Sequence, residues 1–134
     1  MNLQVRTTIL WILLVFCFLL HGYYHVAELF YGINIALDGA KGEVPVSAHI
    51  FSIMIDLLPL TIGVAALYCT GRSFIWFSLI IALLLLLLNL VHLVMTVYHE
   101  PREYRQLVLL TLIIFINALL IKDLNSGRKA ITAT

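Results

Sequence analysis

Six ionisable side chains lie within the long apolar stretches of this chain, where such groups are rare. They are four imidazoles and two carboxylates: His21, His25, Glu28, His49, Asp56 and His92. Ionisable groups in hydrocarbon are costly, so they normally face the interior of a helix bundle and partner one another. We therefore take these residues as the first place to look for function, and their chemistry is that of metal binding or of proton transfer.

Metal binding is the first interpretation, because imidazole and carboxylate groups are protein ligands of zinc, copper and iron. His21 and His25 have the i, i+4 spacing that puts two imidazoles on one helical face, and Glu28 continues that face by another turn. We predict a site for a transition metal ion (zinc, copper or iron) whose ligands are His25, Glu28, His49 and His92. The residues predicted to orient these ligands or to relay protons are His21, Asp56 and Asn89.

Two alternatives stay open beside the metal site. The chain is alternatively a non-catalytic subunit of a larger membrane complex, whose buried polar groups serve helix packing or a proton pathway. A further alternative is a haem protein in which His25 and His92 are the axial ligands of the iron. Glu28 and His49, close by in depth, favour a bare ion over haem. The pattern predicts a site, and it leaves open whether the chain is an enzyme.

The composition shows which elements must position these residues. Of 134 residues, 63% are hydrophobic and 11% are charged, far from the average of soluble domains. A helix needs about 20 apolar residues to cross a bilayer. The chain has four such runs, which predict a single all-α domain over residues 1–134, an integral membrane protein with four transmembrane helices. The predicted helices span approximately 8–33, 46–69, 73–98 and 103–122, and residues 123–134 are predicted to form a loose, polar cytoplasmic tail.

The predicted depth places five of the six side chains in the outer half of the membrane, with His21 near the midplane. At about 1.5 Å per residue, His25 lies roughly 12 Å, His92 roughly 9 Å and Asp56 roughly 15 Å below the outer surface. The polar residues of the first three helices also fall on single helical faces. We therefore expect His25, Glu28 and His92 to come within ligand or hydrogen-bonding distance inside the bundle, in a site that opens outward.

The connections and the charges predict the topology. Short links favour antiparallel neighbours, so an up-down-up-down bundle is expected. Five basic residues fall on the side of both termini and three on the other, a bias that predicts cytoplasmic termini in the inner (plasma) membrane. The two sets are Arg6, Arg72, Lys122, Arg128 and Lys129 against Lys41, Arg102 and Arg105. The expected partners are the lipid bilayer and either further copies of the chain or a larger membrane complex. The basic residues are too few to predict nucleic-acid binding.

Two more residues carry structural expectations. Pro59 lies within the second apolar run and removes a backbone hydrogen bond near Ile55, which predicts a kink just below Asp56. Asn117 is a single amide in the fourth run, and we expect it to make a hydrogen bond between helices.

Overall fold

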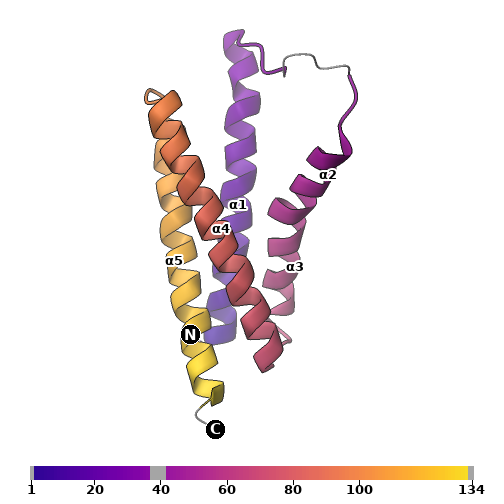
Figure 1. Cartoon of the computed structure of the whole chain (residues 1–134), viewed down its shortest axis with the longest axis vertical. Helices are drawn as coiled ribbons and strands as arrows, with labels where there is room; N and C mark the ends of the chain where they lie inside the picture. The colour runs from indigo at the N-terminus through magenta and orange to yellow at the C-terminus, as the bar shows by residue number, and fades with distance from the viewer. Residues whose placement is uncertain (1, 37–41, 133–134) are drawn as a thin grey trace.

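The computed structural model describes residues 2–36 and 42–132, so Asp38 and Lys41 of the predicted outer loop lie outside the described residues. The described chain is helical and contains no strand (Figure 1). Its elements are α1 (Leu3–Ala27), the 3-10 turn η1 (Glu28–Tyr31), α2 (Val46–Ser52), the π-helical turn η2 (Ile53–Leu57), α3 (Leu58–Ala65), α4 (Arg72–His99) and α5 (Tyr104–Thr132).

Four helical segments are long and apolar enough to cross a membrane, as the sequence predicts. They are Leu3–Tyr31, Val46–Ala65, Arg72–His99 and Tyr104–Ala130. The second of these is continuous but irregular, because the π-helical turn η2 lies between the α-helices α2 and α3. The all-helical class and the four membrane-length helices are thus confirmed.

The helix α1 lies between two neighbours, α5 on one side and α3 on the other, and α4 packs along α5 (Figure 1). The core between them is apolar, and its most completely buried side chains are Trp11, Leu14, Leu110, Ile113 and Leu120. In contrast, α2 contains no buried residue, and its main contacts are with η2. The bundle is therefore well packed around α1, α4 and α5, and it is open on the side of α2.

A glycine allows α1 and α3 to approach closely. A Cβ placed on Gly63 would lie 2.8 Å from the Cβ of Trp11, which is closer than two such atoms can come. Small residues at helix contacts in membranes let the backbones approach and increase van der Waals packing. Gly63 therefore fixes how the α3 end of the second segment sits against α1.

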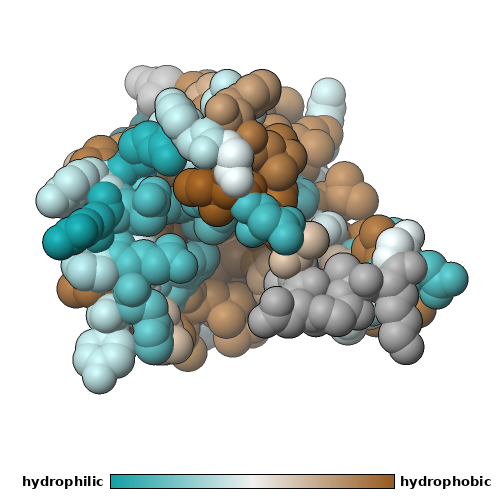
Figure 2. All heavy atoms as spheres, turned by 90° about the horizontal axis from the view of Figure 1, so that it is seen from above, coloured by the Kyte–Doolittle hydropathy of each residue, from teal (hydrophilic) through white to brown (hydrophobic). Residues whose placement is uncertain are grey.

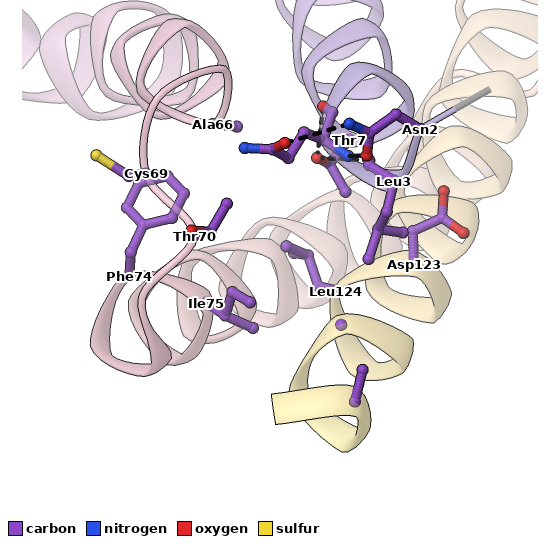
Figure 3. A pocket seen from close by; sticks show the side chains of 13 residues that line it. Asn2, Leu3, Thr7, Ala66, Cys69, Thr70, Phe74, Ile75, Asp123 and Leu124 are labelled. Carbon is purple, nitrogen blue, oxygen red and sulfur yellow. Dashed lines mark hydrogen bonds between the residues drawn. The ribbon is translucent and has the colours of Figure 1, made fainter. Parts of the chain in front are cut away.

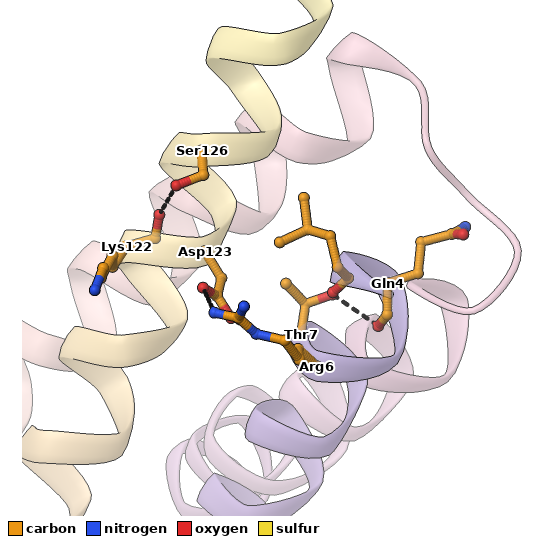
Figure 4. Close-up of polar contacts among 7 residues, drawn as sticks. Gln4, Arg6, Thr7, Lys122, Asp123 and Ser126 are labelled. Atoms are coloured by element: carbon orange, nitrogen blue, oxygen red, sulfur yellow. Dashed lines mark hydrogen bonds and ion pairs between the residues drawn. The ribbon is translucent and has the colours of Figure 1, made fainter. Parts of the chain in front are cut away.

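The first helix begins earlier, and the last helix ends later, than the sequence predicts. The side chain of Asn2 accepts a hydrogen bond from Gln4 N (3.2 Å) and caps α1 at Leu3, five residues before the predicted start. The tail predicted from residue 123 is helical as far as Thr132. Arg6 makes an ion pair with the buried Asp123, as Figure 4 shows, and this contact holds the start of α1 against the end of α5. The expectation of a loose tail is therefore wrong over residues 123–132.

The irregularity expected from Pro59 takes the form of a π-helical turn. The Leu58 N–H donates to Ile53 O, five residues back, and Pro59 follows at once in a completely buried position. A π turn inserts an extra residue into the helical path and often marks a functional site. Here it carries Asp56, one of the predicted site residues.

Candidate functional site

Three imidazoles from two helices meet in the half of the bundle near the α4–α5 turn. The ring of His21 makes near-perpendicular edge contacts with the rings of His25 and His92, with 4.8 Å between ring centroids in both cases. The Nε2 atoms of His21 and His25 are 3.3 Å apart, which is a hydrogen-bonding distance. His21, predicted as a supporting residue, is thus the residue that joins the other two.

A residue from α5, Gln106, completes this cluster. Its Nε2 lies 3.2 Å from His25 Nε2, and its side chain is buried. An amide nitrogen can only donate, so His25 Nε2 is the acceptor in this contact. The ring proton of His25 then lies on Nδ1, and a proton on His21 Nε2 would share the single lone pair of His25 Nε2 with the amide.

Sequence reasoning missed Gln106 because it lies just before the apolar run of the fourth helix. The sequence marks Gln106 only as an uncharged polar residue in the first turn of a helix. Such residues are common at helix ends, so this feature does not identify a site residue.

The carboxylate of Glu28 lies beside His25, toward the α4–α5 turn. Its Oε1 is 3.9 Å from His25 Nδ1, which is an ion-pair distance when the imidazole is protonated and is longer than a hydrogen bond. Glu28 stands at the start of the 3-10 turn η1, not within the α-helical stripe that the sequence predicts. It also lines a hollow of about 440 Å³ at the α4–α5 turn. The acidic side chains that share this hollow with it are Glu100 and Glu103.

On the other side of the imidazoles lies a cavity of about 520 Å³, which we call the lateral cavity. Its walls come from all four membrane-length segments, and its polar lining residues are His21, Ser52, Asp56, Asn89 and His92. Asn89 is buried and donates to Leu85 O of its own helix at 2.7 Å. The predicted supporting residues His21, Asp56 and Asn89 therefore share one cavity.

His21 and His92 lie in the wall of this open space, and His25 is exposed beside it, so the imidazoles are not inside a sealed core. His25 has 48% of its side chain exposed, and His92 is also exposed. Figure 2 looks down on this end of the molecule. Hydrophilic residues gather on the side of α4 and α5, and a hollow separates them from α2. The expectation that these groups are enclosed by the bundle therefore does not describe His25 and His92.

The four predicted metal ligands are only partly brought together. His25 and Glu28 are neighbours, and His92 reaches His25 through His21. His49 is exposed on α2 and does not line the lateral cavity. Within residues 2–36 and 42–132, no group of three or more His, Cys, Asp or Glu side chains has a geometry that could hold a metal ion. Among these residues the structure thus supports no metal site of three or more such ligands, and His21, which contacts both proposed axial imidazoles, does not support haem ligation.

The opposite end of the bundle has a cavity of its own, of about 350 Å³ (Figure 3). Residues from the start of α1, the α3–α4 turn and the end of α5 line it, among them Thr7, Cys69 and Asp123. The Asp123 carboxylate is already neutralised by Arg6, with Arg6 Nε 3.0 Å from Asp123 Oδ2. No pattern along the chain connects these two residues, which are 117 positions apart.

Asn117 has the structural role expected of it. It is completely buried, and with the amide oriented to match its neighbours it bonds the backbone of α4. Nδ2 donates to Ala82 O at 3.2 Å, and Oδ1 accepts from Leu86 N at 2.9 Å.

No protein-family model, curated protein or solved structure matches this chain.

Proposed function

We propose that this chain is a plasma-membrane protein in which Glu28, His25 and His21 carry protons between the acidic hollow at the α4–α5 turn and the lateral cavity. The observation that supports it is a row of titratable groups, each within 4 Å of the next, that runs between the two spaces. Glu28 lines the outer hollow and faces His25 at 3.9 Å, His25 is 3.3 Å from His21, and His21 lines the cavity.

The arrangement suits proton transfer because an imidazole can take up a proton on one nitrogen and release another from the second. His21 takes up a proton on Nδ1, which has no hydrogen-bond partner among the described residues. The His21 Nε2 proton then passes to His25 Nε2, and the His25 Nδ1 proton passes to Glu28. Each group gains and loses one proton, and the carboxylic acid releases its proton to water. Return of a proton along the same route restores the starting tautomers, so net transfer in one direction requires both imidazoles to exchange their ring protons with water before the next step.

Nuclear magnetic resonance of the ¹⁵N-histidine-labelled protein in lipid nanodiscs tests the central step. We expect a scalar coupling between the Nε2 atoms of His21 and His25 across their shared hydrogen bond. The coupling disappears in His25→Gln and persists in His49→Gln, the control for a histidine outside the cavity. Slower exchange of the His21 imidazole proton with water in His25→Gln would show that His25 is its route. A coupling that is absent from the unmodified protein rules out the relay.

The orientation and assembly belong to the same proposal. An up-down-up-down bundle with both termini in the cytoplasm puts Glu28 and the α4–α5 turn outside. The exposed apolar surface then contacts lipid, further copies of the chain or the subunits of a larger complex. The close approach of Leu3 to Gly127 supports the position of both termini at one end of the bundle, because it places the first residues of α1 beside the last turns of α5.

A metal ion remains the second candidate, on the strength of one distance. Two nitrogen ligands at about 2.0–2.1 Å from a tetrahedral zinc ion lie about 3.3–3.4 Å apart. The Nε2 atoms of His21 and His25 have that separation. Metal analysis of the detergent-purified protein separates the candidates. A stoichiometric ion that is lost in His25→Ala and in His92→Ala but retained in His49→Ala favours the metal. If the protein contains no ion after expression in medium supplemented with zinc, copper and iron, the metal candidate is ruled out.

A further inference from the structure

The lateral cavity has a shape and a lining that identify the kind of molecule it could hold. Its volume of about 520 Å³ falls within the range of roughly 300–1,000 Å³ typical of small-molecule sites. Its floor is apolar and well packed, with Leu110 and Ile113 each 1% exposed. A few polar groups placed in apolar walls are the usual composition of such sites.

The cavity opens sideways, toward the position of the lipid. Its rim is formed by large apolar side chains on the outer surface of α2 and α4, and these are more than half exposed: Phe51, Leu88, Val91 and Met95. The main contacts of α2 are with η2 and those of α4 are with α5, so the space between α2 and α4 is not closed by packing. Both helices belong to membrane-length segments. A molecule dissolved in the bilayer can therefore enter directly.

The charges of the lining select an uncharged head group. Among the described residues that line the cavity, none is Lys or Arg, and the one ionisable acid is Asp56. A phosphate or a fatty-acid carboxylate would find no counter-charge there and would meet a carboxyl group, which is unfavourable in hydrocarbon. The imidazoles of His21 and His92 and the hydroxyl of Ser52 are instead hydrogen-bonding partners for carbonyl or hydroxyl oxygens.

From these features we propose that the lateral cavity binds a quinone from the bilayer. The polar groups lie on different elements, with the imidazoles on α1 and α4 and with Asp56 and Ser52 on the η2 and α2 wall. A flat ring with oxygens on opposite edges can use both sets, while its apolar tail leaves through the rim between α2 and α4. This inference rests on the proposed function, because it names the molecule that the cavity end of the relay meets.

Binding to the full chain in quinone-free nanodiscs tests the inference. The probes are decylubiquinone, decylbenzene as a tail without oxygens, and dioleoylglycerol as a hydroxyl lipid. We expect decylubiquinone to bind saturably and its carbonyl infrared band to shift to lower frequency, as for a hydrogen-bonded carbonyl. Decylbenzene should not compete. Competition by dioleoylglycerol equal to that by the quinone would show a general site for neutral lipids and would overturn the assignment.

Two matched tryptophan variants locate the site. Leu88→Trp places a large ring at the rim, and we expect it to weaken quinone binding by about tenfold or more, the effect of about 1.4 kcal/mol. Leu87→Trp is the control, because Leu87 is equally exposed on α4 but does not line the cavity. Equal affinities for the two variants contradict the proposed position. The coupling between His21 and His25 is measured separately, so quinone binding without the coupling overturns only the relay, and the coupling without quinone binding overturns only this inference.

Discussion

The chemistry of single residues depends here on which neighbour each one meets. His25 and His49 are both imidazoles in membrane-length segments, and both are exposed. His25 has a carboxylate on one nitrogen and an imidazole and an amide on the other, whereas His49 lies outside the cavity. This difference makes His49→Gln the natural control for every experiment on the cluster.

Gln106 offers the sharpest prediction about tautomers. Replacing it with Leu removes the amide donor, so His25 Nε2 is no longer held as an acceptor and the ring proton redistributes between its nitrogens. The ¹⁵N shifts of His25 should change, and the protein should lose about 0.6–2 kcal/mol of stability, the range for hydrogen bonds between membrane helices. Thr111→Val is the control, since the exposed Thr111 bonds only Leu107 O of its own helix. Unchanged His25 shifts in Gln106→Leu would contradict the tautomer assigned above.

Gly63 gives a prediction about packing at a single position. Gly63→Ala puts a methyl group 2.8 Å from Trp11 Cβ, so α1 and α3 must separate. We expect a loss of about 1–3 kcal/mol, as for other overpacked cores. Gly22→Ala is the matched control, because nothing lies within 4 Å of its added Cβ and alanine favours the helix. Unfolding in mixed detergent micelles measures both, and equal stability of the two variants would show that the α1–α3 contact is not tight.

At the scale of the elements, the ends of α1 and α5 depend on one ion pair. Arg6→Gln leaves the carboxylate of Asp123 buried without its partner, since Asp123 is only 4% exposed. Such an orphaned group costs about 1–3 kcal/mol. The double variant with Asp123→Asn should recover part of that loss.

The control for this ion pair is Glu103→Gln. Its partner Arg105 is 3.7 Å away in a solvent-exposed pair, and the change should stay within about 0.5 kcal/mol. A cost of Arg6→Gln no larger than that of Glu103→Gln would mean that the ion pair does not hold the helix ends together. Hydrogen exchange over residues 123–132 measures the local effect, because fraying of the last turns of α5 exposes those amides.

Periodic features of the sequence were predictable, and contacts between distant elements were not. Four long apolar runs predict the four helices, although α5 extends ten residues past its predicted end. The i, i+4 spacing of His21 and His25 places them on one face because both belong to a single helix. The roles of Gln106 and Asp123 depend on which helix lies opposite, and no spacing along the chain encodes that. His49 was assigned by its depth and by the helical face that it shares with Asp56, and neither includes the separation of α2 from α1 and α4.

The irregular second segment shows the same limit. Pro59 indicated a disturbed hydrogen bond near Asp56, and the structure has one there. A proline identifies where a helix is irregular, but whether the outcome is a kink or a π turn depends on the side chains around it. The π turn matters for the site because Asp56 lies within it and lines the lateral cavity.

For the molecule as a whole, the arrangement predicts which ends face which side of the membrane. The α3–α4 turn and the α4–α5 turn are separated by α4, which has 28 residues and is therefore about 40 Å long at 1.5 Å per residue. Cys69 is exposed near the first turn, and Arg102 is exposed in the second. Cysteines at these two positions therefore report on opposite ends of the bundle. Cys17 is buried, so we expect it to stay unlabelled in the unmodified chain and in a variant with a cysteine at position 102.

Labelling of intact cells with a membrane-impermeant maleimide then tests the orientation. The chain with Cys69 should react only after permeabilisation, and the Cys69→Ser, Arg102→Cys variant should react without it. The physical reason is the excess of basic residues beside Cys69, which favours retention of that end in the cytoplasm. The reverse pattern would place the acidic hollow and the imidazoles on the cytoplasmic side, so that protons would leave the cavity inward. Reaction of both proteins from the same side would show that α4 does not span the membrane, and the up-down-up-down arrangement would have to be abandoned.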